Sequence, residues 1–244
     1  MILNRTDPRE AGAMDKGLSE IFHPLLAQWF SGRYSSPTEA QKGAWPVIAA
    51  GRHLLLSAPT GTGKTYSAFL YAINQLLTGA WEAGRVRVLY ISPLKALNSD
   101  IRVNLLSPLA QISALFRARG LSVPAIQVQT RSGDTPESER RRMLRHPPEI
   151  LITTPESLNL ILSSPNAWGL LTGIQTVIID EIHSVLESKR GTHLITAIER
   201  LVPLSGEFQR IGLSATIRPM ELAAAFLGGY VGRQTGAGWT YEPR

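Results

Sequence analysis

Two stretches of the sequence combine residue types that point to phosphate chemistry. The first is APTGTGKT, residues 58–65, which follows the apolar run HLLLS and has alanine where such loops usually begin with glycine. Gly61 and Gly63 allow a turn in which backbone N–H groups face a phosphate, and the N-terminus of a following helix adds a favourable field. Lys64 can reach the outer phosphates of a nucleotide, and Thr65 can bind magnesium. The predicted phosphate-binding residues are Thr60, Gly61, Thr62, Gly63, Lys64 and Thr65.

The second stretch is VIIDEIHS, Val177–Ser184, in which two acids directly follow an apolar run. Adjacent carboxylates repel each other and lose solvation at the end of a buried strand, so a positive partner is expected beside them. Magnesium and Lys64 can supply that charge. Asp180 is the candidate metal ligand together with Thr65, and Glu181 is the candidate base that orients and deprotonates the attacking water. We therefore assign catalytic roles to Lys64, Asp180 and Glu181.

Apolar runs and helical segments predict the elements that would position these residues. Buried strands are expected at His53–Ser57, Val86–Ser92, Ala125–Thr130, Ile150–Thr153, Thr176–Asp180 and Arg210–Ser214. Helices are expected at Thr65–Leu77, Pro136–Leu144 and His193–Val202. The alternation of strand and helix indicates an α/β fold, with a mostly parallel central sheet flanked by helices. Residues 1–50 read as a helical prelude within the same domain.

Composition narrows the class of protein and its partners. The chain has 244 residues, of which 43% are hydrophobic, and no apolar run approaches the length of a transmembrane helix. Its N-terminal stretch lacks an apolar signal core, which predicts a cytoplasmic protein. Cysteine is absent and the five histidines are scattered, which excludes disulfides and argues against a zinc site. The net charge of +6 favours a polyanionic partner such as nucleic acid.

The arginine-rich run ERRRMLR, Glu139–Arg145, is a candidate for binding a nucleic acid. Glu137 and Arg141, however, stand four residues apart on one predicted helix, where opposite charges pair. We therefore favour a solvated, salt-bridged surface over a nucleic-acid contact for this run.

Taken together, the motifs resemble those of superfamily 2 helicases in order and spacing over nearly the whole chain. DEIH, residues 180–183, resembles the DExH box of that family, and SPTEAQ, residues 36–41, resembles its adenine-recognising Q element, in which Gln41 would read the base. Phe30 or Tyr34 is a candidate to stack nearby, and either can instead be core. The stretches SPLKALNSDI, PPEILITTPESLNLIL and DEIHSVLESKRGTHL are similar to the large helicase-related (Lhr) family.

The same resemblance implies nucleic-acid contacts and a coupling element. SPLKALN resembles motif Ia of the family, TPESL motif Ib and SAT motif III, while the glycine of RSGD permits close approach of a backbone. TPESL also has the residues expected at the start of a helix, with threonine near the N-cap and proline in the first turn. The same residues can cap the helix and contact a phosphate. The implied nucleic-acid contacts are Pro93, Lys95, Asn98, Gly133, Asp134, Thr154, Pro155 and Glu156. The implied coupling residues are His183, Ser214 and Thr216.

As to function, the resemblance implies an ATP- and Mg²⁺-dependent helicase that moves 3′-to-5′ along single-stranded DNA and acts in DNA repair. RNA or an RNA–DNA hybrid is an alternative substrate. Such an enzyme needs a second RecA-like domain that carries an arginine finger. Residues 51–230 read as the first RecA-like domain, and residues 231–244 as the start of a linker to a second one missing from this chain. The chain alone is therefore expected to bind nucleotide weakly and to hydrolyse it slowly.

Two other interpretations stay open. The chain could be a nucleic-acid-binding module without turnover, which intact Lys64, Asp180 and Glu181 disfavour. It could also be a P-loop ATPase that moves on duplex DNA or remodels protein without separating strands, which the Lhr-like stretches disfavour.

Overall fold

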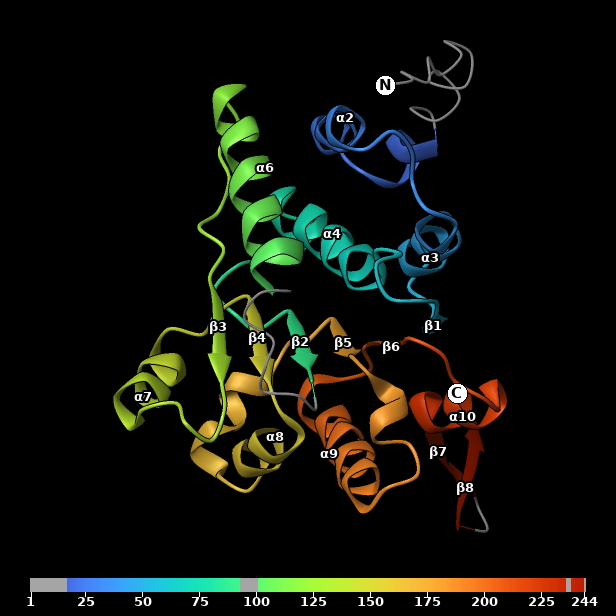
Figure 1. The fold of residues 1–244 in the computed structure, drawn as a ribbon. Helices are drawn as coiled ribbons and strands as arrows, with labels where there is room; N and C mark the ends of the chain where they lie inside the picture. Colours follow the sequence, from blue (N-terminus) through green and yellow to red (C-terminus); the bar gives the residue numbers. More distant parts are fainter. Residues whose placement is uncertain (1–16, 93–100, 236–237, 244) are drawn as a thin grey trace.

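A six-stranded parallel sheet forms the centre of the molecule (Figure 1). The computed structural model describes residues 17–92, 101–235 and 238–243. The strand order is β1-β6-β5-β2-β4-β3. The strands are β1 (Leu54–Ser57), β2 (Val88–Ile91), β3 (Val128–Arg131), β4 (Ile150–Thr153), β5 (Thr176–Ile179) and β6 (Gln209–Ser214). All six predicted strands are therefore confirmed, with small shifts at their ends.

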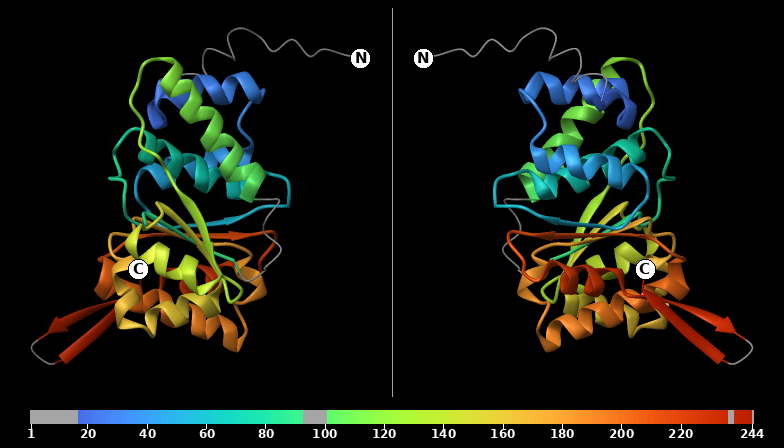
Figure 2. Two further views of the ribbon diagram at one scale, coloured as in Figure 1. Left: turned by 90° about the vertical axis from the view of Figure 1, so that its left-hand side faces the viewer. Right: turned by 90° about the vertical axis from the view of Figure 1, so that its right-hand side faces the viewer.

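Helices cover both faces of this sheet, as the predicted α/β architecture requires (Figure 2). One face carries α2 (Pro24–Arg33), α3 (Glu39–Ala49), α4 (Lys64–Leu77), the short π-helix η1 (Arg102–Leu106) and α6 (Ser107–Ala118). The other carries α7 (Glu137–Arg145), α8 (Pro155–Leu162), α9 (Lys189–Ser205), α10 (Met220–Gly228) and the 3-10 helices η2 (Pro165–Leu171) and η3 (Ile182–Ser184). The three predicted helices are α4, α7 and α9. Within the described ranges, no helix is long and apolar enough to cross a membrane.

The core lies in two apolar clusters that the sheet separates. Alternate residues of a strand point to opposite faces, so Val88 and Tyr90 of β2 pack with α3, α4 and α6. Leu89 and Ile91 pack with α8 and α9 on the other side. Both faces of β2 are thus buried, which explains why the sequence of this strand is apolar throughout rather than alternating.

Beyond α10, two strands form an antiparallel hairpin that extends away from the sheet (Figure 2). They are β7 (Tyr230–Thr235) and β8 (Gly238–Pro243). These strands differ from the start of a linker that the sequence predicts over residues 231–244. That this segment leads to a further domain stays a prediction.

Candidate functional site

One cavity gathers most of the residues that were predicted to bind nucleotide. It has a volume of about 520 Å³ and lies where the ends of β1 and β5 face the start of α4. Among the predicted residues, Gln41, Thr60, Gly61, Gly63, Lys64, Thr65, Asp180 and Glu181 line it. The cavity is also lined by Tyr34, Ser36, Thr38, Tyr66 and Asn104.

The glycine loop connects β1 to α4 in the manner expected of a phosphate-binding turn. Gly61 and Gly63 have φ angles of 81° and 79°, a left-handed conformation that costs glycine little and other residues more. The Thr62 hydroxyl donates a hydrogen bond of 2.8 Å to the carbonyl oxygen of Pro59, which closes the loop on itself. The side chain of Thr62 therefore serves the loop, and Thr62 does not line the cavity.

Lys64 begins α4 with its ammonium group inside the loop. The residue is only 7% exposed, and its Nζ donates to the carbonyl oxygens of Ala58 at 2.5 Å and Pro59 at 2.8 Å. Burial lowers the pKa of Lys64, while the negative charges of Glu181 and Asp180 act to raise it. The two carboxylates thus oppose the effect of burial and favour the charged form of the lysine.

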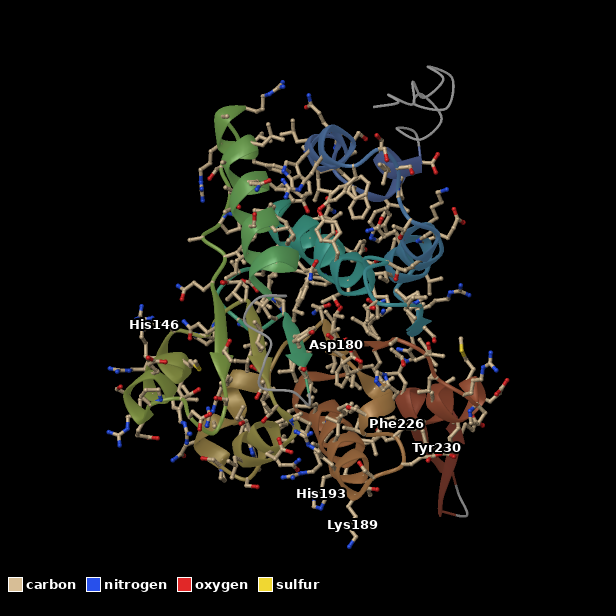
Figure 3. The ribbon with its side chains drawn as sticks, viewed as in Figure 1. His146, Asp180, Lys189, His193, Phe226 and Tyr230 are labelled. Carbon is tan, nitrogen blue, oxygen red and sulfur yellow. The ribbon has the colours of Figure 1, made fainter. Side chains whose placement is uncertain are left out.

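Asp180 follows β5 and lies near the middle of the molecule (Figure 3). It is 7% exposed. Its Oδ1 accepts a hydrogen bond of 2.9 Å from the backbone N–H of Glu181, and its Oδ2 accepts one from the hydroxyl of Tyr90. Because Thr65 lines the same cavity, a hydroxyl and a carboxylate oxygen are present together, which suits the preference of Mg²⁺ for oxygen ligands.

Glu181 connects the acidic pair to the predicted coupling residues. It has φ 49° and ψ 42°, a strained conformation for a residue with a side chain, of the kind that clusters at functional sites. Its Oε2 lies 3.2 Å from Nε2 of His183, and Nδ1 of His183 lies 3.0 Å from Oγ of Ser214. The carbonyl oxygen of Ser214 accepts a hydrogen bond of 3.1 Å from the N–H of Ala58. A continuous chain of contacts thus runs from Glu181 to the glycine loop, and the exposed Thr216 is not among these contacts.

The Q-like element is fixed to the glycine loop by a helix cap. Thr38 is the N-cap of α3: its Oγ1 accepts from the N–H of Gln41, and Oε1 of Gln41 accepts from the N–H of Thr38 at 2.9 Å. The Thr38 hydroxyl also donates a hydrogen bond of 2.8 Å to the carbonyl oxygen of Thr62. The amide nitrogen of Gln41 lies against Gly63, where a Cβ atom would be only 2.6 Å away. Gln41 is therefore held in position before any base arrives.

Of the two aromatic candidates for stacking, the structure places only Tyr34 at the cavity. Phe30 is 1% exposed and belongs to the core cluster beneath α2, whereas Tyr34 is 36% exposed and lines the cavity. Sequence reasoning missed Tyr66, whose ring centroid lies 5.7 Å from that of Tyr34, and Asn104 of η1. Tyr66 directly follows Thr65 in the sequence, and this position next to the glycine loop is the signal that could have identified it as a lining residue.

The predicted motif Ib caps α8 and carries an ion pair. The Thr154 hydroxyl accepts a hydrogen bond from the N–H of Ser157, and Pro155 is the first helical residue, so the capping interpretation is confirmed. Nε and Nη2 of Arg190 lie 2.5 and 3.2 Å from the two carboxylate oxygens of Glu156. The hydrogen bond from Arg190 holds the pKa of Glu156 below its usual range. The Glu156 side chain is therefore engaged within the protein.

The RSGD loop lies beside motif Ib because β3 and β4 are neighbours in the sheet. The Thr153 hydroxyl donates a hydrogen bond of 2.8 Å to the carbonyl oxygen of Arg131, which joins the ends of the two strands. Nη2 of Arg140 donates to the carbonyl oxygen of Gly133 at 2.8 Å, so α7 steadies the loop that contains Asp134. Gly133, Asp134, Thr154 and Pro155 are thereby brought to one edge. Of the remaining predicted contacts, Glu156 pairs with Arg190 as described above, and Pro93, Lys95 and Asn98 lie outside the described residues.

The arginine-rich run on α7 carries the ion pair that its spacing predicted. Nε of Arg141 lies 3.1 Å from Oε1 of Glu137, and both side chains are largely exposed. This surface pairing is confirmed. Nothing in it requires a nucleic acid.

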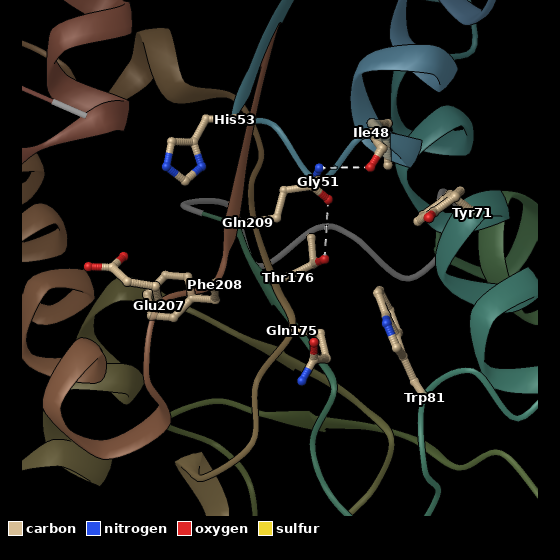
Figure 4. A pocket seen from close by; sticks show the side chains of 10 residues that line it. All are labelled: Ile48, Gly51, His53, Tyr71, Trp81, Gln175, Thr176, Glu207, Phe208 and Gln209. Atoms are coloured by element: carbon tan, nitrogen blue, oxygen red, sulfur yellow. Dashed lines mark hydrogen bonds between the residues drawn. The ribbon is translucent and has the colours of Figure 1, made fainter.

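A second and larger cavity lies away from these residues. It has a volume of about 620 Å³ and is lined by the aromatic side chains of Tyr71, Trp81 and Phe208 and by His53 (Figure 4). It lies at the starts of β5 and β6, which is the opposite edge of the sheet from the glycine loop. The acidic pair and Lys64 are not among its lining residues, so the smaller cavity is the candidate site for a nucleotide.

Comparison with known proteins gives relatives over most of the chain. The pattern of the DEAD/DEAH box helicase family matches residues 38–224. An Lhr helicase/probable uracil glycosylase of Mycolicibacterium smegmatis is 50% identical over 85% of this chain and 14% of its own length. The ATP-dependent helicase Lhr-Core protein 2 of Thermococcus barophilus is 45% identical over 88% of this chain and 25% of its own length. The chain therefore spans a quarter or less of these two relatives.

Solved structures agree with these sequence relationships. The chain matches the structure of Mycobacterium smegmatis helicase Lhr bound to ssDNA and AMP-PNP with a TM-score of 0.81 and 48% identity, over 87% of this chain and 27% of that one. The DEAD-box helicase Mss116 bound to ssRNA and UDP-BeF has a TM-score of 0.71 at 17% identity, over 88% of this chain and 43% of that one, and shows the shared fold. The fold, the site and the matched pattern agree: this chain belongs to the DEAD/DEAH box helicase family, with a RecA-like domain similar to that of Lhr helicases.

Proposed function

We propose that this chain is the ATP-binding motor domain of a nucleic-acid-dependent ATPase of the Lhr type. The observation that carries the proposal is the single cavity in which the glycine loop, Lys64, Thr65, the acidic pair and Gln41 meet. A triphosphate bound along the loop would place its base toward Gln41 and its outer phosphates toward Lys64 and the acids. The relatives named as ATP-dependent helicases, and the Lhr structure with AMP-PNP, support this assignment.

Each of these residues has a physical role in the proposed reaction. Lys64 neutralises charge on the outer phosphates, and the loop N–H groups bind their oxygens. Thr65 and Asp180 would hold Mg²⁺, which when bound supplies further positive charge to the phosphate oxygens. Glu181 orients the attacking water and accepts its proton. In this proposal His183 relays a change at the outer phosphate to the end of β6, and its contacts with Glu181 and Ser214 support that role.

Single-stranded DNA is the proposed nucleic-acid partner, with RNA or an RNA–DNA hybrid as the alternative. The edge formed by Gly133, Asp134, Thr154 and Pro155 offers loop backbone and the N-terminus of α8 to a phosphate chain. The ssDNA in the Lhr structure supports DNA. We further propose that a second RecA-like domain completes the ATP site. The 3′-to-5′ polarity, a role in repair and a cytoplasmic location stay predictions that rest on the family resemblance.

Nucleotide binding and turnover by the purified chain test this proposal. We would measure both for the unchanged chain, for Lys64→Ala and for Lys42→Ala, with and without single-stranded DNA. Lys42 is a matched control because its side chain is exposed and pairs with Glu39 on the surface. We expect ATP binding that is lost in Lys64→Ala and kept in Lys42→Ala, with slow turnover because in this proposal a second domain supplies the arginine finger.

The other outcomes would choose between the interpretations. Retained DNA binding without any ATP binding would refute the motor and favour a binding module. ATP turnover that duplex DNA stimulates as well as single strands do would favour a translocase or remodeller. Robust DNA-stimulated turnover, lost only in Lys64→Ala, would keep the ATPase assignment and refute the need for a second domain.

A further inference from the structure

Tyr90 lies outside every motif discussed above, yet its hydroxyl donates a hydrogen bond to Oδ2 of Asp180. The residue is in β2, the strand next to β5, and it is fully buried. Asp180 is the acid whose carboxylate lines the candidate nucleotide cavity. A fully buried phenol at the centre of the sheet thus contacts the proposed metal ligand directly.

The register between β2 and β5 brings Tyr90 and Asp180 together. Tyr90 pairs with Ile178 of β5, and Asp180 stands two residues further along the same chain. Side chains two residues apart point to the same face of a sheet, so Tyr90, Ile178 and Asp180 share the face that α4 covers. Two residues of strand span roughly 6.6 Å, and a tyrosine that leans along its strand bridges such a distance.

Packing from α4 fixes the ring. The ring centroids of Phe69 and Tyr90 are 5.0 Å apart, with an angle of 30° between the rings, and Phe69 is fully buried. Phe69 follows Thr65 by four residues, so both lie on one face of α4. The helix that presents Thr65 to the cavity therefore also holds Tyr90 against Asp180.

We propose that Tyr90 is a positioning residue for the magnesium-binding Asp180, an inference that rests on the proposed ATPase function. The Tyr90 hydroxyl holds Oδ2 and the N–H of Glu181 holds Oδ1, so the carboxylate is fixed at both oxygens. A carboxylate oxygen has more than one lone pair, so an oxygen that accepts a hydrogen bond can also bind a metal or a water bound to it. Removing the hydroxyl takes away one of these two hydrogen bonds and so weakens the hold on the orientation in which the carboxylate meets the metal.

Replacing Tyr90 with phenylalanine removes the hydroxyl and keeps the ring that packs on Phe69. The readout is the affinity of a fluorescent, non-hydrolysable ATP analogue, measured in Mg²⁺ and again in excess EDTA. Loss of such an outer partner typically weakens metal binding 10- to 100-fold, so we expect roughly a 10-fold or larger loss of the magnesium-dependent part of the affinity. The affinity in EDTA should not change. Tyr71→Phe is the matched control, since Tyr71 lies in α4 beside the other cavity.

Further measurements separate positioning from a structural role. In an Asp180→Asn background, Tyr90→Phe should add no further magnesium effect, because the carboxylate that it orients is gone. Equal losses of affinity with and without Mg²⁺, together with a lower Tm, would show that Tyr90 only stabilises the fold and would overturn the inference. An unchanged magnesium dependence in Tyr90→Phe would overturn it while leaving the ATPase proposal intact. If the unchanged chain bound no nucleotide in Mg²⁺, the function and the inference would both fail.

Discussion

The contact between Gly63 and Gln41 makes a quantitative prediction for Gly63→Ala. An added Cβ atom would lie 2.6 Å from the amide nitrogen of Gln41, so the flexible end of that side chain must move. Moving it breaks the hydrogen bond from the N–H of Thr38 to Oε1 of Gln41 and opens the capping box of α3. The same substitution also places alanine at φ 79°.

The magnitude follows from these two effects. Alanine in the left-handed region costs about 1–2 kcal/mol. Loss of the hydrogen bond to Gln41 costs about 0.5–1.5 kcal/mol more. We therefore expect Gly63→Ala to lower the free energy of unfolding by roughly 1.5–3.5 kcal/mol in total. In a chain of this size each kcal/mol corresponds to a fall of roughly 2–4 °C in Tm.

Gly61→Ala is the matched control, because it shares one of these effects and not the other. Gly61 has φ 81°, yet nothing lies within 4 Å of a Cβ atom built there. Urea unfolding should therefore give only the backbone cost of about 1–2 kcal/mol for Gly61→Ala. In a Gln41→Ala background the cost of Gly63→Ala should fall to the same level. Equal losses for the two glycine substitutions in the unchanged background would refute the argued role of Gln41.

Three further predictions concern single side chains. Thr154→Ala should cost about 1 kcal/mol in urea unfolding through loss of the α8 N-cap, and Thr154→Ser, which keeps the hydroxyl, should restore it. Glu137→Gln should change stability by less than about 0.5 kcal/mol, because its pair with Arg141 is exposed; a larger loss would mean that α7 depends on this pair. Lys64 has a lowered pKa in the folded state, so between that value and 10.5 the unfolded chain binds more protons and stability rises with pH. Unfolding measured between neutral pH and 10.5 should therefore show the unchanged chain gaining stability relative to Lys64→Met as pH rises, and a parallel pH dependence would contradict the burial of the charge.

The strands and the glycine loop could be predicted because their signals are local. A strand such as Ile150–Thr153 is buried on both faces and is therefore apolar at nearly every position. The run from Thr60 to Thr65 also follows one strand and opens one helix, so its chemistry can be understood from neighbours in sequence. The grouping of these residues around one cavity could also be predicted, because parallel strands bring their carboxyl ends to one edge of the sheet.

The contacts that the sequence did not reveal depend on packing between distant segments. Tyr90 meets Asp180 only through the register of β2 with β5, and Asn104 reaches the cavity from η1. Phe30 is buried and Tyr34 is exposed because of the way in which α2 packs. Both are aromatic residues with similar neighbours in sequence, so the sequence alone did not tell them apart. The antiparallel pairing of β7 with β8 joins two segments that do not carry the long apolar runs of the central strands.

The position of β6 between β1 and β5 has a consequence for the spacing within the candidate site. Adjacent strands are about 4.8 Å apart, so β6 sets a spacing of roughly 10 Å between the strand before the phosphate loop and the strand before the acids. Gly212 at its centre pairs with Leu55 and Ile179, and an added Cβ atom would lie 3.0 Å from Leu227. That atom would point out of the plane of the sheet toward α10, so a larger residue at this position would push on α10 and leave the spacing between the strands unchanged. The backbone of β6 therefore holds the two halves of the site apart, and changes in its side chains act on the packing of α10 instead.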